Sequence, residues 1–157
     1  MTTIQSEHFT KALLMLLNET FENVHGIYLD KNTSMFETLA GISAEEASIP
    51  VGGNGSTLAA QVKHASFYLD KIAIFMQDRN APRADWGEIW RTVNRVTPEE
   101  WQSIQDELRV NYKSVQKLIE SKQEWPDEDT IAIAMAFVAH SAYHLGDIRQ
   151  ALCVLRH

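Results

Sequence analysis

Two histidines four residues apart, His140 and His144, are the residues of this sequence best suited to chemistry. They lie in an apolar stretch, residues 136–150, that contains no proline. On an α-helix, residues i and i+4 lie on one face, about one turn apart. Both imidazoles therefore belong to a stripe that should face a core. That stripe consists of Ile133, Phe137, His140, His144, Ile148, Ala151 and Leu155.

A buried imidazole needs a partner for its ring nitrogens. No acidic residue precedes Asp147 within the apolar stretch, so three interpretations remain open: a distant hydrogen-bond partner, a metal ion, or a helix end in contact with water. A third histidine, His64, lies in another apolar segment and favours the metal ion. Three neutral imidazoles from two helices would leave coordination positions free, as in catalytic metal sites.

Three further side chains are candidates around this site. Asp147 follows His144 by three residues and forms either a hydrogen bond to a ligand or an ordinary surface ion pair. Tyr68 follows His64 by one turn and is either a donor toward the open side of the site or a core tyrosine. His25 is either a fourth histidine of the site or a polar residue beside a helix bend.

Two tryptophans, Trp86 and Trp90, stand in a segment over residues 79–97 that has no regular pattern. We expect them to act as a hydrophobic plug that holds this connector on the helices. The alternatives are the mouth of a pocket and a dimer contact.

Helical periodicity of apolar residues predicts four long helices, over residues 6 to about 30, 57 to about 78, 98 to about 121, and from 128 onward. The expected N-caps are Ser6, Ser56 or Thr57, Thr97 and Asp127. Residues 31–56 form a long crossover, with a short helix expected after Ser43 and an irregular glycine-rich loop over 50–56. Residues 131–135 alternate like a strand, but the surrounding helical pattern favours a helix.

This pattern predicts an all-α four-helix bundle, a single domain over residues 1–157 with a long connection between its first two long helices. Facing helices of such a bundle can assemble a metal site. We therefore expect the three histidines to meet between two of these helices.

Composition excludes several classes of partner. The net charge is −7 and no basic block occurs, which argues against nucleic acid and against an anionic membrane surface. We expect no membrane span, because no apolar run approaches about 20 residues. Residues 1–7 lack the features of a signal peptide. The single cysteine, Cys153, excludes an internal disulfide and fits a reducing cytoplasm.

The segment over residues 140–150, together with His64, resembles the DinB/YfiT-like superfamily of metal-binding four-helix bundles. That family carries one histidine in its second helix and His-x-x-x-His in its fourth, followed by a Gly-x-Ile type sequence. Here the corresponding residues read His-x-x-x-His-Leu-Gly-Asp-Ile-Arg. Asp147 stands where many members have a histidine or a glutamine after the glycine, which alters the surroundings of the ligands or the preferred metal.

The resemblance implies a right-handed up-down-down-up bundle and frequent homodimers. It implies a divalent metal, zinc or nickel, on His64, His140 and His144. Characterised members include thiol S-transferases that use bacillithiol or mycothiol, relatives of maleylpyruvate isomerase, and proteins similar to amide hydrolases. The implied partners are a small-molecule substrate and a low-molecular-weight thiol.

Two functions follow as hypotheses. The first is a metal-dependent enzyme, either a thiol-dependent S-transferase or a hydrolase. No acidic residue has an obvious general-base position, which favours a transferase that uses a metal-bound thiol. Ser141 stands where a His-Glu-x-x-His zinc peptidase needs its glutamate, so that class is excluded. The second is a non-catalytic bundle that serves as a dimeric interaction module or a metal-binding module.

Overall fold

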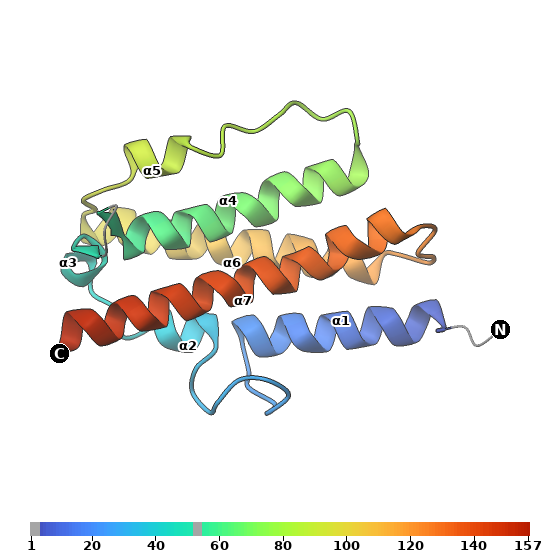
Figure 1. The fold of residues 1–157 in the computed structure, drawn as a ribbon, viewed down its shortest axis with the longest axis horizontal. Coiled ribbons are helices and arrows are strands. Elements are labelled where there is room, and N and C mark those ends of the chain that lie inside the picture. The colour runs from blue at the N-terminus through green and yellow to red at the C-terminus, as the bar shows by residue number, and fades with distance from the viewer. Residues whose placement is uncertain (1–3, 52–54) are drawn as a thin grey trace.

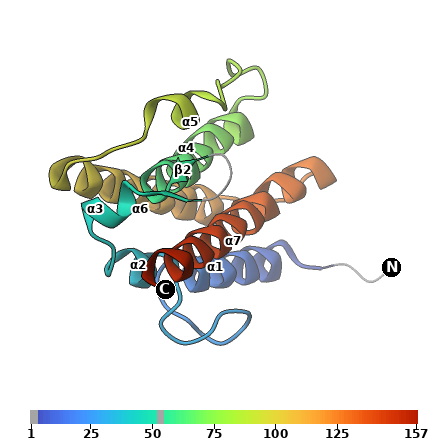
Figure 2. The same cartoon turned by 60° about the vertical axis from the view of Figure 1, so that its left-hand side comes forward.

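Four long helices dominate the computed structural model, which describes residues 4–51 and 55–157. The chain is all-α, and the long helices run side by side (Figure 1). They are α1 (Ser6–Phe21), α4 (Leu58–Gln77), α6 (Pro98–Glu120) and α7 (Glu128–Arg156). Helices α1 and α4 each pack against both α6 and α7, so the four helices enclose a common interior (Figure 2).

Short elements occupy the connections. The shorter helices are α2 (Met35–Leu39), α3 (Ala44–Ala47) and α5 (Glu88–Thr92), and the strands are β1 (Pro50–Val51) and β2 (Ser56–Thr57). The two strands pair antiparallel, with Pro50 opposite Thr57. Helix α5 lies over the outer side of α4, on the connector that leads to α6 (Figure 1). This connector carries both tryptophans of residues 79–97.

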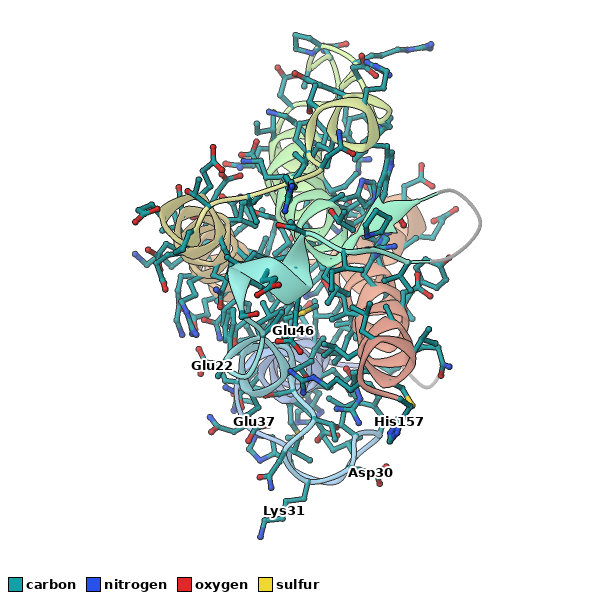
Figure 3. All side chains as sticks on the ribbon, turned by 90° about the vertical axis from the view of Figure 1, so that its left-hand side faces the viewer. Glu22, Asp30, Lys31, Glu37, Glu46 and His157 are labelled. Atoms are coloured by element: carbon teal, nitrogen blue, oxygen red, sulfur yellow. The ribbon has the colours of Figure 1, made fainter. Side chains whose placement is uncertain are left out.

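The core fills the space between the long helices (Figure 3). Tyr112 of α6 stacks on Phe21 of α1, with ring centroids 4.5 Å apart and planes 23° from parallel. Leu69 of α4 and Phe137 of α7 are fully buried as well. Burial of one large apolar side chain contributes about 1.5–3 kcal/mol, so these contacts fix the relative positions of the helices.

Local sequence signals for helix starts are confirmed in most places. The side chains of Thr57, Thr97 and Asp127 each accept a hydrogen bond from a backbone N–H in the first turn of the following helix. Ser43 opens α3 with a capping box, as expected. A further capping box, formed by Ser34 and Glu37, starts α2, a helix that was not predicted.

The first helix is shorter than predicted. It ends at Phe21 instead of about residue 30, and its N-cap is Gln5, whose side chain makes no capping bond, so Ser6 is the first helical residue. The early end has a tertiary cause. The buried carboxylate of Glu19 accepts backbone N–H bonds from residues 25, 27, 28 and 29, which folds the chain back on the helix end.

Two expectations about irregular segments are also corrected. The connector over residues 79–97 contains the helical turn α5, and the glycine-rich segment contains β1 and β2. Residues 52–54 of that segment lie outside the described part of the chain.

Helix α7 is the one helix within the described residues that is long and apolar enough to cross a membrane, with a mean hydropathy of 1.3 over an 18-residue window. The expectation that no apolar run approaches about 20 residues is therefore wrong by the criterion of helix length and hydropathy. The finding is weak support for a membrane span, because the core helix of a soluble protein passes the same test. In this structure α7 packs along α1 and α4.

Candidate metal centre

The three predicted histidines converge between two neighbouring helices. His64 comes from α4, whereas His140 and His144 come from successive turns of α7. The ring centroids of His64 lie 5.3 Å from His140 and 4.8 Å from His144, and the latter two are 4.5 Å apart. One nitrogen from each ring lies within 4.8 Å of the other two, so the three residues are close enough to bind a metal ion.

Burial keeps these imidazoles in the neutral form that binds metals. His64 and His144 are buried and His140 is half-buried. Burial lowers the pKa of His64 below its usual 6.5. Burial and the neighbouring histidines lower the pKa of His140 to about 4 and that of His144 to about 3. All three rings are therefore uncharged near neutral pH, each with one nitrogen lone pair available.

Two buried ring nitrogens have no hydrogen-bond partner among the described residues, namely Nδ1 of His64 and Nε2 of His140. An unsatisfied buried polar atom is unfavourable by about 1–3 kcal/mol, so a native structure normally gives it a partner. One nitrogen from each of the three rings lies within 4.8 Å of the others, so a single ion is a partner that the three rings could share. The residues therefore fit a divalent metal.

The orientation of His144 is set by a residue that the sequence analysis missed. Nδ1 of His144 lies 2.8 Å from Oε1 of Gln61. Because an amide oxygen only accepts, Nδ1 carries the proton and Nε2 is left as the ligand atom. Gln61 precedes His64 by three residues on α4, so helical spacing was the available signal for it.

The other predicted site residues have different outcomes. Tyr68 stacks on His140 with ring centroids 3.6 Å apart and planes 13° from parallel, so it positions that ring. Burial raises the pKa of Tyr68, which keeps its hydroxyl protonated. An Asp147 oxygen lies 4.0 Å from Nδ1 of His144, beyond hydrogen-bond distance, and Gln61 occupies that nitrogen.

His25 is not brought to the cluster. It lies exposed in the loop after α1, where its Nε2 lies 2.8 Å from Oδ1 of Asn18. The loop follows from the end of α1 at Phe21. The interpretation of His25 as a fourth histidine of the site is therefore wrong.

The connector tryptophans lie at the histidine cluster. The ring of Trp90 packs against His64 with centroids 4.7 Å apart, and Trp86 lies 6.4 Å from the same ring. Trp86 also contacts Phe67 and Tyr68. Both tryptophans remain partly exposed. Of the three interpretations, this position fits the mouth of a site best.

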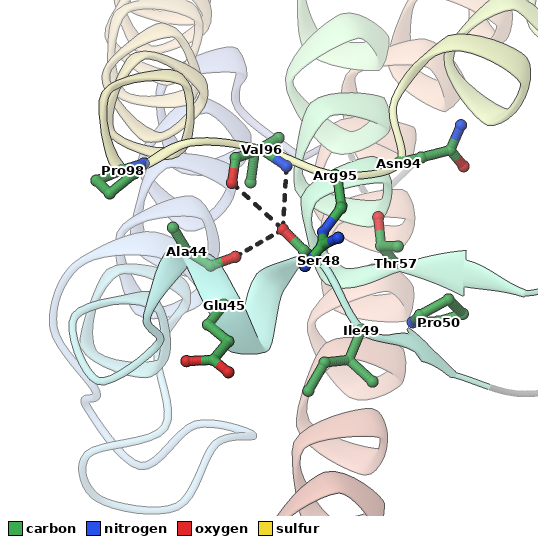
Figure 4. A pocket seen from close by; sticks show the side chains of 10 residues that line it. All are labelled: Ala44, Glu45, Ser48, Ile49, Pro50, Thr57, Asn94, Arg95, Val96 and Pro98. Atoms are coloured by element: carbon green, nitrogen blue, oxygen red, sulfur yellow. Dashed lines mark hydrogen bonds between the residues drawn. The ribbon is translucent and has the colours of Figure 1, made fainter.

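Two clefts lie near the start of α4. One of about 390 Å³ adjoins the centre and is lined by Gln61, Asp147 and Gln150. The larger, about 690 Å³, lies between α3 and the loop that enters α6, where the Ser48 hydroxyl donates to the Ala44 carbonyl (Figure 4). None of the three histidines lines the larger cleft.

Fold and site together define an all-α protein with a three-histidine cluster between α4 and α7. No family model matches the chain, and neither does any curated protein or solved structure. A functional conclusion therefore depends on the residues themselves.

Proposed function

We propose that this chain is a metal-dependent enzyme of the DinB/YfiT-like type, with zinc or nickel held by His64, His140 and His144. The observation that carries the proposal is the pair of buried ring nitrogens, on His64 and His140, that have no partner in the described chain. A third nitrogen, Nε2 of His144, is oriented as a ligand by the bond to Gln61. Three such nitrogens satisfy the ligand requirement of a catalytic zinc site.

We further propose the up-down-down-up four-helix bundle of that superfamily. Support comes from the helix directions, because α4 and α6 run opposite to α1 and α7 (Figure 1). It also comes from the packing, in which each of α1 and α4 contacts both α6 and α7. The connector over residues 79–97 runs back along α4, which allows α4 and α6 to run in the same direction (Figure 1).

When bound, a divalent ion in this site supplies a Lewis acid that lowers the pKa of a water or thiol ligand. The chain's own residues prepare that site. Gln61 holds the proton of His144 on Nδ1, and stacking against Tyr68 fixes the plane of His140. The three histidines are neutral, so they would leave the positive charge of a bound ion uncompensated.

A thiol-dependent transferase fits these residues better than a hydrolase. Hydrolysis at such centres normally uses a carboxylate as general base. Asp147 lies at the Nδ1 side of His144, 4.0 Å from a nitrogen that Gln61 already occupies. It is therefore on the wrong side of the ring to act on a ligand of Nε2, whereas a thiol held as thiolate needs no such base.

Metal binding is the first test. Untagged protein is titrated with zinc in competition with a chromophoric chelator, beside the variants His144→Ala and His64→Ala. We expect one zinc per chain in the wild type and a loss of affinity of more than about 100-fold in each variant. His25→Ala is the matched control, since it removes an exposed histidine outside the cluster. A wild type that binds no more tightly than His144→Ala would refute the metal centre.

Reaction type is the second test. The zinc-loaded and nickel-loaded proteins are incubated with small-molecule electrophiles and low-molecular-weight thiols, and thiol consumption is followed. A transferase consumes thiol with wild-type protein and not with His144→Ala. Amide hydrolysis without thiol consumption would instead assign the hydrolase.

A second candidate is a non-catalytic metal-binding module. It is favoured by the burial of the centre, since His64 is only 8% exposed and His144 only 5%. In that case an exogenous ligand added to cobalt-substituted protein leaves the visible spectrum unchanged, because no coordination position is accessible. Homodimerisation in the cytoplasm is part of our proposal for either candidate, and sedimentation velocity measures the oligomeric state.

A further inference from the structure

Each of the three histidine rings has an aromatic neighbour from a different part of the chain. The pairs are Trp90 with His64 at 4.7 Å, Tyr68 with His140 at 3.6 Å, and Tyr143 with His144 at 5.1 Å between ring centroids. Trp86 joins them by contact with Tyr68, 5.9 Å away. We name Tyr68, Trp86, Trp90 and Tyr143 the aromatic rim. The rim therefore combines α4, α7 and the connector around α5.

Much of this rim faces solvent. Trp86 is 41% exposed, Trp90 is 37% exposed and Tyr143 is 64% exposed, so their rings are not buried by the core. The cleft of about 390 Å³ beside the centre is a less suitable approach. The adjoining cleft meets His144 through Gln61, which occupies Nδ1 and not the ligand nitrogen. A molecule that reaches the open side of the centre therefore meets aromatic faces.

Charge decides which kind of molecule suits these faces. Aromatic faces attract both cations and planar aromatic groups. With three neutral imidazole ligands, the ion keeps its full double positive charge beside the rim. A cationic group would be repelled by that charge at short range. An aryl group gains stacking without this repulsion, and a donor such as thiolate compensates the charge.

We propose that the substrate of this centre carries an aryl group next to the donor atom that binds the ion, and that the aromatic rim is the wall that holds the aryl group. The inference rests on the proposed function, because it places the donor on the metal. It adds the substrate class: a small molecule with an anionic or neutral metal-binding head and an adjacent aromatic ring. Trp86, Trp90 and Tyr143 determine this specificity.

The test uses two probes that share a metal-binding head. Cobalt-substituted protein is titrated with acetohydroxamate and with benzohydroxamate, and the change in the visible cobalt spectrum gives each Kd. We expect benzohydroxamate to bind about tenfold more tightly. The double variant Trp86→Ala, Trp90→Ala should bring the two probes to nearly equal affinity, and the ratio of the two Kd values is the readout.

Matched variants separate the rim from general effects of tryptophan loss. Trp125→Phe alters a tryptophan that packs against Phe9 and donates to Thr10, in the turn before α7, and should keep the full preference. Tyr143→Ala removes a more exposed rim residue and should by itself reduce the preference for benzohydroxamate. If circular dichroism shows that the double variant no longer folds, Tyr143→Ala serves as the test of the rim.

The outcomes are distinct. Equal affinity of the wild type for the two probes, or a preference that survives in both rim variants, overturns the aryl proposal and leaves the metal centre in place. Failure of the wild type to bind cobalt overturns the metal centre and this inference with it.

Discussion

Gln61 and His144 make the contact on which the chemistry of the centre depends most directly. An imidazole can present either nitrogen to a metal, and the hydrogen bond at the other nitrogen decides which. Here the amide oxygen of Gln61 accepts a hydrogen bond from the Nδ1–H of His144, with 2.8 Å between nitrogen and oxygen, so Nε2 carries the lone pair that can bind a metal. At the residue scale the site therefore comprises four side chains: three histidines that are close enough to bind an ion, and Gln61, which orients one of them.

Replacement of this amide should weaken metal binding. We expect Gln61→Leu to lower zinc affinity by about 10–100-fold, because His144 loses the partner that fixes its tautomer and ring plane. Gln61→Glu should retain most of the affinity, since a carboxylate also accepts a hydrogen bond from the Nδ1–H of His144. Competition titration with a chelator measures both. Gln150→Leu, in the same cleft but away from His144, is the control, and equal losses in the two leucine variants would contradict this role.

At the scale of elements, Glu19 determines where α1 ends. Its two carboxylate oxygens accept four backbone N–H bonds, from Tyr28 and Leu29 on one oxygen and from His25 and Ile27 on the other. The Glu19 side chain that accepts these bonds is fully buried near the end of the helix. The loop over residues 22–34 therefore folds around a charge inside the protein.

Loss of that charge should destabilise the fold. An amide at this position has only one acceptor oxygen, so Glu19→Gln leaves two backbone N–H groups without a partner. We expect the free energy of unfolding to fall by about 2–3 kcal/mol, measured by urea denaturation. Glu7→Gln, which alters an exposed glutamate of the same helix, should change it little. A Glu19→Gln protein as stable as the wild type would show that the loop does not depend on these bonds.

The same carboxylate predicts an acid-dependent stability. Burial disfavours its ionised form, but the four backbone donors together outweigh burial and lower its pKa from 4.5 to about 2. A carboxyl group with a depressed folded-state pKa adds stability above its unfolded pKa, and this contribution is lost as pH falls through the folded value. The stability gap between wild type and Glu19→Gln should therefore narrow between about pH 4.5 and pH 2. A gap that stays constant across this range in urea titrations would contradict the assignment.

At the scale of the whole molecule, the histidine centre joins α4 to α7, which are separated by the connector and α6. An ion bound there acts as a crosslink between the two helices in the folded state. Because the unfolded chain does not hold the three rings together, binding energy adds to the stability of the fold.

Zinc should therefore raise the unfolding free energy. At free zinc about 100 times its Kd, we expect an increase of about 2.7 kcal/mol in the wild type. The same buffer should leave His144→Ala unchanged. Thermal unfolding in a zinc buffer measures the shift, with calcium at equal concentration as a control for ionic effects. A rise of the same size in both proteins would mean that zinc acts elsewhere on the surface.

The sequence by itself determined the four long helices, most of their caps, and the three histidines as a set. These features depend on local rules: the period of apolar residues, and bonds between side chains and backbone within one turn. His140 and His144 share a face of α7 for the same reason. The pairing of this face with His64 required only that two apolar stripes meet in one core.

Only the tertiary structure decided the end of α1, the role of Gln61 and the position of the tryptophans. Gln61 and His144 are 83 residues apart in sequence. Trp90 meets His64 because the connector crosses the outer side of α4, and a segment without periodicity gives no local indication of its path. Glu19 accepts bonds from residues of the following loop, and those residues reach it only because the helix ends at Phe21. The end of the helix and the path of the loop therefore depend on each other, and neither can be inferred from local sequence alone.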